Sequence, residues 1–122
     1  FTGLVPPSSI PEMLSAMDLL AHPSWREGLP RAVVQAMIAR VPVVASDANG
    51  TKEVVINNKT GWLVNIGDHI GLSKSVLDCI FDHTKRDELI KNAFDLTISN
   101  FSSEKMVEET LLQYQLILED AF

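Results

Sequence analysis

Residues 41–46, Val-Pro-Val-Val-Ala-Ser, are apolar at nearly every position, and this run constrains the fold more than any other feature of the chain. A strand with one solvated face alternates apolar and polar residues, whereas a strand covered on both faces does not. Residues 18–22 form a second, shorter run of the same kind. The separation of the two runs exceeds the roughly dozen residues that a parallel crossover requires. We therefore predict a βαβ unit in a parallel sheet.

The residues between the two runs predict a helix from Pro30 to about Arg40. Pro30 suits the first helical position because its missing N–H would have no intrahelical partner there. We expect this helix to bury a set of small and apolar side chains, namely Ala32, Val33, Ala36, Met37 and Ala39.

Further elements are predicted on both sides of this unit. A short helix is expected over residues 10–17, where Ser9 and Glu12 have the spacing of a capping box. Another short helix is expected over residues 51–56 and a third strand over residues 62–65. Alternating strands and helices predict an α/β fold, a Rossmann-like parallel sheet with flanking helices.

The last third of the chain has a helical period. Asp68, Thr84 and Ser102 are the expected N-caps of three helices. The expected buried faces are Ile70, Val76, Leu77, Ile80 and Phe81 on the first helix, Leu89, Ile90, Ala93 and Phe94 on the second, and Val107, Leu111, Tyr114 and Leu118 on the third.

Charge and residue types exclude several functions. The net charge of −6, with no basic cluster, would repel a phosphate backbone, so we expect no nucleic-acid partner. The single cysteine, Cys79, cannot form an internal disulfide and is expected to be a buried hydrophobe in a reducing compartment. His22, His69 and His83 lack metal-ligand spacing, so no metal site is predicted.

Two loops are the expected place for a ligand. In parallel sheets ligands bind beyond the carboxyl ends of the strands, and residues 24–29 and 47–51 follow two such ends. A right-handed crossover places both loops on one rim. The helix that begins at Pro30 would present the backbone N–H groups of Arg31, Ala32 and Val33, with its positive dipole end, to an anion such as a diphosphate.

Three segments, in order, resemble one large family. They are His-Pro-Ser-Trp-Arg-Glu-Gly-Leu-Pro-Arg-Ala-Val-Val-Gln-Ala-Met at residues 22–37, Val-Pro-Val-Val-Ala-Ser-Asp-Ala-Asn-Gly-Thr-Lys-Glu-Val-Val at 41–55 and Thr-Gly-Trp-Leu-Val at 60–64. They resemble retaining, nucleotide-sugar-dependent glycosyltransferases of the GT-B fold (group 1, family 4 type). The resemblance implies that residues 1–122 are a truncated GT-B C-terminal domain, the donor-binding portion, without the N-terminal domain of the same protein.

The resemblance also implies the site residues. The family motif is two glutamates with seven residues between them; this chain has Glu27 at the first position and Gln35 at the second. Glu27 would be the catalytic residue that binds the donor sugar, and Gln35 would bind the ribose with a weaker amide oxygen. The remaining donor-binding residues would be Gly28, Leu29, Pro30, Arg31 and Ala32. The family commonly has Gly-Leu in place of Pro30-Arg31, so one backbone donor is lost and a guanidinium is gained.

The implied reaction transfers a sugar from a nucleoside diphosphate donor, most commonly UDP, to an acceptor glycan or lipid-linked sugar, with retention and without a cofactor. The resemblance also implies an enzyme of polysaccharide biosynthesis in the cytoplasm. A peripheral position of the enzyme at the inner face of the membrane is an open alternative. Two alternatives remain: a GT-B-type nucleotide-sugar epimerase, or an inactive nucleotide-sugar-binding fragment. The alternatives without a binding function are that Glu27 caps the helix that begins at Pro30 and that Gln35 is a solvent-exposed helix residue.

The family comparison implies the strand order 3-2-1-4-5-6, with strands one and two absent. Residues 1–4 would be strand three, and residues 19–22, 43–46 and 62–65 would be strands four, five and six. We expect residues 1–4 to be detached or to pair non-natively, and residues 19–22 to be a bare edge prone to self-association. Part of the apolar stripe of the last helix would be uncovered.

Overall fold

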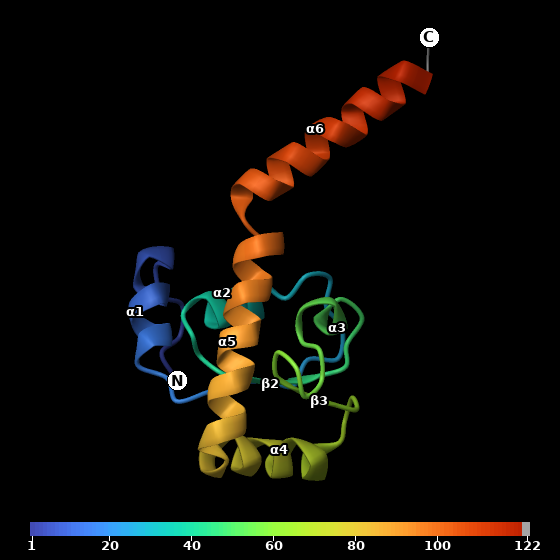
Figure 1. Ribbon diagram of the computed structural model, residues 1–122. Coiled ribbons are helices and arrows are strands. Elements are labelled where there is room, and N and C mark those ends of the chain that lie inside the picture. Colours follow the sequence, from blue (N-terminus) through green and yellow to red (C-terminus); the bar gives the residue numbers. More distant parts are fainter. Residues whose placement is uncertain (121–122) are drawn as a thin grey trace.

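The computed structural model describes residues 1–120. A compact body carries one helix, α6, that projects away from it (Figure 1). The elements in chain order are the 3-10 turn η1 (Pro7–Ser9), α1 (Ile10–Ser15), β1 (Leu20–His22), α2 (Arg31–Ile38), β2 (Val43–Ser46), α3 (Thr51–Val54), β3 (Trp62–Val64), α4 (His69–Phe81), α5 (His83–Asn100) and α6 (Ser103–Asp120).

The three strands form a parallel sheet in the order β1-β2-β3. Leu20 lies opposite Val43, and Val44 lies opposite Trp62. All four residues of β2 are buried. The predicted α/β class, the parallel pairing and the order of the strands expected at residues 19–22, 43–46 and 62–65 are confirmed.

The N-terminal residues are separate from this sheet. Residues 1–4 form no strand, and Phe1 and Leu4 are fully exposed. Their expected detachment is confirmed. Among the described residues β1 pairs only with β2, so its other edge is unpaired. Self-association through that edge stays a prediction.

The core has a cluster of side chains on each face of the sheet. Val43 and Ala45 pack with residues of α2, including Val33 and Met37. The intervening strand residue Val44 packs on the other side in a second cluster, with Trp62, Cys79 and Leu89. Because neighbouring strand residues point to opposite faces, this arrangement explains the continuous apolar run of residues 41–46.

Cys79 confirms the prediction of a buried small hydrophobe. It is 1% exposed, and its burial raises the pKa of the thiol. A raised pKa keeps the thiol protonated and therefore unreactive at neutral pH.

The start of α2 differs from the prediction. Pro30 is the N-cap with extended backbone angles, and the helix begins at Arg31. Proline has the same fixed φ at both positions, so the sequence does not distinguish them. On this helix Ala32 is exposed, contrary to the prediction, and Val34 is buried although it was not among the predicted residues.

The buried face of α4 was also predicted wrongly. Of the expected residues, Ile70, Leu77, Ile80 and Phe81 are exposed and only Val76 is partly buried. The face that packs on the sheet instead consists of Leu72, Val76 and Cys79. The α5 face was predicted correctly, because Leu89 and Ala93 are buried and Ile90 and Phe94 are half-buried.

Two of the predicted caps are confirmed. The carboxylate of Asp68 accepts from the backbone N–H of Gly71 at 2.8 Å, and the hydroxyl of Ser102 accepts from Lys105 N–H at 3.1 Å. Thr84 is not an N-cap. Asp82 is both the C-cap residue of α4 and the N-cap residue of α5. Ser9 makes no capping bond, because it belongs to the 3-10 turn η1 that leads into α1.

The apolar stripe of α6 is uncovered along its length. Val107, Leu111, Tyr114 and Leu118 are each at least half exposed. Figure 1 shows the reason, since the helix leaves the body after α5 and has no neighbour beyond its first turns. Ala121 and Phe122, which belong to the predicted domain, lie outside the described residues. Within residues 1–120, no helix is long and apolar enough to span a membrane.

Candidate functional site

The loops after β1 and β2 lie against each other at the carboxyl edge of the sheet. The backbone N–H of Gly50 donates to the carbonyl of Glu27 at 3.3 Å. A Cβ at Gly50 would overlap the carbonyl group of Gly28, so only glycine permits this approach. The expectation that the two loops share one rim is confirmed.

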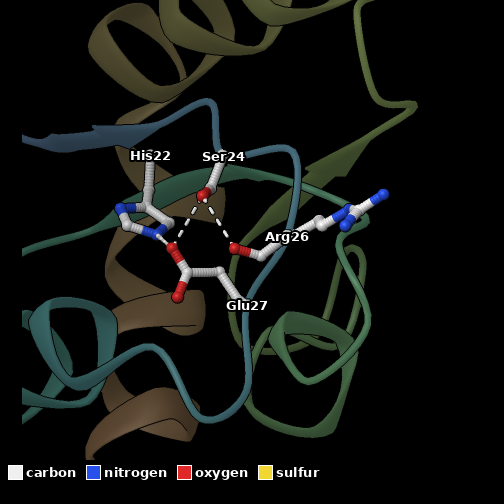
Figure 2. A network of polar contacts seen from close by, with 4 residues as sticks. All are labelled: His22, Ser24, Arg26 and Glu27. Carbon is white, nitrogen blue, oxygen red and sulfur yellow. Dashed lines mark hydrogen bonds and ion pairs between the residues drawn. The ribbon is translucent and has the colours of Figure 1, made fainter.

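Glu27 is held in a small polar cluster on this rim (Figure 2). The hydroxyl of Ser24 donates to Glu27 Oε1 at 2.7 Å, and His22 Nε2 lies 2.9 Å from the same oxygen. The side chains of His22 and Glu27 are 21% and 24% exposed, so the cluster is open to a ligand from solvent. The side chain of Arg26 points away from the carboxylate in Figure 2.

This cluster favours the ionised form of Glu27. The hydrogen bond from Ser24, and next that from His22, lower the pKa of the Glu27 carboxyl. Hydrogen bonds that stabilise a charged form always shift the pKa toward that form. Glu27 is therefore a fixed negative charge at neutral pH and a strong acceptor for hydroxyl groups.

Two other roles for this cluster do not fit its geometry. Glu27 does not cap α2, because no side chain bonds to that helix at its N-cap and the carboxylate bonds to His22 and Ser24 instead. A hydrolytic triad would need the serine hydroxyl on the histidine. Here the Ser24 hydroxyl donates to Glu27 instead of to His22, so the histidine is not placed to take its proton.

The N-terminus of α2 retains part of the expected anion site. The N–H of Val33 is already bonded to the carbonyl of Pro30 at 3.0 Å, so it is not available to a ligand. Arg31 and Ala32 are exposed, and the first two N–H groups of a helix have no intrahelical acceptor. Two of the three expected backbone donors are thus left for a phosphate.

Gln35 lies on an exposed face of α2. This face borders an open hollow of about 940 Å³ between α2 and the junction of α5 with α6. Of the predicted site residues, Leu29, Arg31 and Gln35 line the hollow. Glu27, Gly28, Pro30 and Ala32 do not, so the structure divides the predicted set between the rim and this hollow.

His22 and Ser24 are the residues that the sequence did not single out for a role at the site. His22 was expected to be structural or on the surface, although it ends a strand at the rim. The sequence feature that could have indicated a role for His22 is its position five residues before Glu27. A tight turn separates the two residues, and in it Ser24 N–H donates to the His22 carbonyl at 3.0 Å. Only the turn brings the three side chains together.

Replacing Ser24 with alanine should raise the pKa of Glu27, because the strongest of its two stabilising hydrogen bonds is lost. The lowered pKa adds stability that is present above the unfolded-state pKa and is lost as pH falls through the folded-state pKa. The difference in unfolding free energy between wild type and S24A should therefore shrink on acidification.

A carboxyl ¹³C NMR titration of Glu27 measures this change directly. Ser73→Ala, at an exposed position of α4, is the matched control and should leave the titration unchanged. An unchanged Glu27 titration in S24A would show that the Ser24 bond is absent in solution.

The family is settled by comparison with known sequences. The profile described as "Glycosyl transferases group 1" matches residues 1–96 of the 122. The chain belongs to the group 1 glycosyltransferases.

Individual relatives agree with this assignment. The Anabaena protein HepE, solved in complex with UDP-glucose, is 32% identical with a TM-score of 0.78, over 85% of this chain and 30% of HepE. The capsular polysaccharide biosynthesis glycosyltransferase CapM of Staphylococcus aureus is 27% identical, over 86% of this chain and 28% of CapM. This group 1 chain thus spans about 30% of the length of such relatives.

One further solved structure concerns the fold alone. Sucrose-phosphate synthase of Thermosynechococcus elongatus is 24% identical and has a TM-score of 0.89 over 98% of this chain and 30% of its own. Coverage of 98% must include most of α6, whose eighteen residues are a larger share of the chain than the part left out. The similarity of fold to this structure therefore extends into α6.

Proposed function

We propose that residues 1–122 form the nucleotide-sugar-binding part of a glycosyltransferase that moves a sugar from a UDP-sugar to a hydroxyl group of a glycan or lipid-linked sugar, with retention of configuration. One observation carries the proposal: a carboxylate held in its ionised form on the ligand rim of a parallel sheet, beside the N-terminus of α2. Similarity to HepE, which binds UDP-glucose, supports UDP as the nucleotide.

The proposed donor would lie along the rim and α2. Glu27 would accept hydrogen bonds from the sugar hydroxyls, and the backbone of Gly28, Leu29 and Pro30 would line the path of the diphosphate. Arg31 and Ala32 would supply the phosphate donors. A guanidinium at Arg31 adds a positive charge near the leaving group, where it stabilises the charge that develops. Gln35 would hold the ribose.

The chemistry needs no protein nucleophile. The acceptor oxygen would bond to the anomeric carbon on the face from which the diphosphate leaves, while the bond from that carbon to the phosphate oxygen breaks. The acceptor proton would pass to the departing phosphate oxygen. The protein then contributes by positioning the donor and by stabilising the charge of the leaving group.

The acceptor site is proposed to lie on another domain of the same protein. The chain spans about 30% of its relatives' length, so most of a comparable enzyme lies outside it. We propose accordingly that residues 1–122 belong to the C-terminal domain and are inactive in transfer by themselves.

The test uses the full-length protein with UDP-glucose alone, followed by ¹H NMR. A retaining transferase should bind the donor and release glucose slowly, with the α anomer appearing before mutarotation. Early β-glucose would contradict retention. A new nucleotide sugar in place of free glucose would identify an epimerase, and a protein that binds neither UDP-glucose nor UDP would overturn the proposed donor.

A further inference from the structure

We propose that His22 and Ser24 are positioning residues, which fix the carboxylate of Glu27 so that one oxygen is occupied and the other is presented to the donor sugar. This inference rests on the proposed function, because it assumes that Glu27 binds the sugar. Both short contacts in the cluster end on the same atom, Glu27 Oε1. Among the described residues, Oε2 has no hydrogen-bond partner, and Figure 2 shows it on the side turned away from His22 and Ser24.

The two donors are anchored to the sheet. His22 is the last residue of β1 and pairs with Ala45 of the central strand β2. Ser24 is tied to His22 through the bond from its N–H to the His22 carbonyl at 3.0 Å. The position of Oε1 is therefore set by the sheet, although Glu27 itself lies on a loop.

The backbone of Glu27 is anchored separately. Its carbonyl accepts from Gly50 N–H at 3.3 Å, in the loop that follows β2. The side chain is thus held at its carboxylate by β1 and at its backbone by the β2 loop. A free glutamate side chain loses rotamer entropy when it is immobilised. Fixing it in advance removes that cost from ligand binding.

The protons in the cluster follow from its chemistry. An ionised carboxylate only accepts hydrogen bonds, so the proton between His22 and Glu27 is on Nε2 of the imidazole. The Ser24 hydroxyl has a single proton, and its short contact, at 2.7 Å, is to the same oxygen, whereas the Arg26 carbonyl lies at 3.4 Å. The donors that both side chains direct into the cluster end on Glu27 Oε1, so we infer that their effect on the sugar passes through Glu27.

Paired substitutions in the full-length protein separate the donated hydrogen bond from packing. His22→Phe keeps a ring but removes the donor, whereas His22→Gln places an amide N–H near the position of Nε2. Ser24→Ala removes the hydroxyl, and Ser24→Thr keeps it. Each variant is titrated by calorimetry with UDP-glucose and, separately, with UDP, which lacks the sugar that Glu27 is proposed to bind.

The expected result is specific to the sugar. H22F and S24A should each weaken UDP-glucose binding about tenfold, the usual scale for losing a hydrogen bond to a charged group, while UDP binding stays unchanged. H22Q and S24T should restore most of the UDP-glucose affinity.

Each other outcome has one meaning. Equal loss of UDP and UDP-glucose affinity would show that the variants disturb the loop and would overturn a positioning role. Normal binding in H22F with loss in H22Q would show that the His22 ring acts by packing. Glu27→Ala distinguishes failure of the proposed function from failure of this inference. If E27A keeps full UDP-glucose affinity, the proposed function fails. If E27A loses UDP-glucose affinity but the His22 and Ser24 variants do not, only the inference about His22 and Ser24 fails.

Discussion

Alanine at Glu27 should lower the turnover of UDP-glucose by the full-length protein about 100- to 1000-fold, the range found when one stabilising group of a preorganised site is removed. The structure gives the physical reason. The carboxylate is ionised, partly exposed and fixed by two hydrogen bonds, so its loss removes a preset charge-assisted acceptor and not a mobile surface group.

Glu88→Ala is the matched control for this measurement, because Glu88 is an exposed glutamate on α5 away from the rim. It should leave kcat and KM unchanged. The measurement is the kcat and KM of both variants from steady-state kinetics, with circular dichroism to confirm that both variants are folded. Near-normal kinetics in E27A would remove Glu27 from the site and, with it, the main support for the proposed donor position.

Alanine at Gly50 should destabilise the protein by about 3 kcal/mol, because the new Cβ would occupy the place of the Gly28 carbonyl and force the two rim loops apart. The hydrogen bond from Gly50 N–H to the Glu27 carbonyl would be lost in the same movement. Donor binding should therefore fall together with the free energy of unfolding.

The partner of this contact provides the control. A Cβ at Gly28 would meet nothing within 4 Å, and Gly28 does not have a positive φ. Gly28→Ala should change the free energy of unfolding by less than about 1 kcal/mol. Urea unfolding of the two variants measures the contrast. Equal stability of G50A and G28A would mean that the rim loops are not in contact in solution.

Local sequence patterns predicted the sheet well but the buried faces of the helices unevenly, correctly for α5 and wrongly for α4, for a physical reason. The run at residues 41–46 is short and rich in valine, which favours a strand over a helix, and its lack of alternation indicates that both faces are covered. In α4, by contrast, apolar residues surround the helix: Ile70, Leu72, Val76, Leu77, Cys79, Ile80 and Phe81. Which of them face the sheet depends on packing between elements, which periodicity does not contain.

The last helix shows a second limit of the same kind. The spacing of Val107, Leu111, Tyr114 and Leu118 correctly indicates an amphipathic helix, but a pattern cannot show whether the covering surface is part of the same chain. At the site, the resemblance pointed to Glu27. It could not reveal the contacts of His22 and Ser24, because a tight turn and a strand end create them.

The burial of Cys79 has a practical consequence for labelling. It is the only cysteine of the sequence, it is 1% exposed, and its thiol pKa is raised. Maleimides and spin labels react with accessible thiolates, so the native protein offers such reagents almost no target. A cysteine introduced at exposed Leu111 of α6, or at exposed Trp25 of the rim, would therefore carry a fluorophore or a nitroxide alone, without prior removal of the natural thiol.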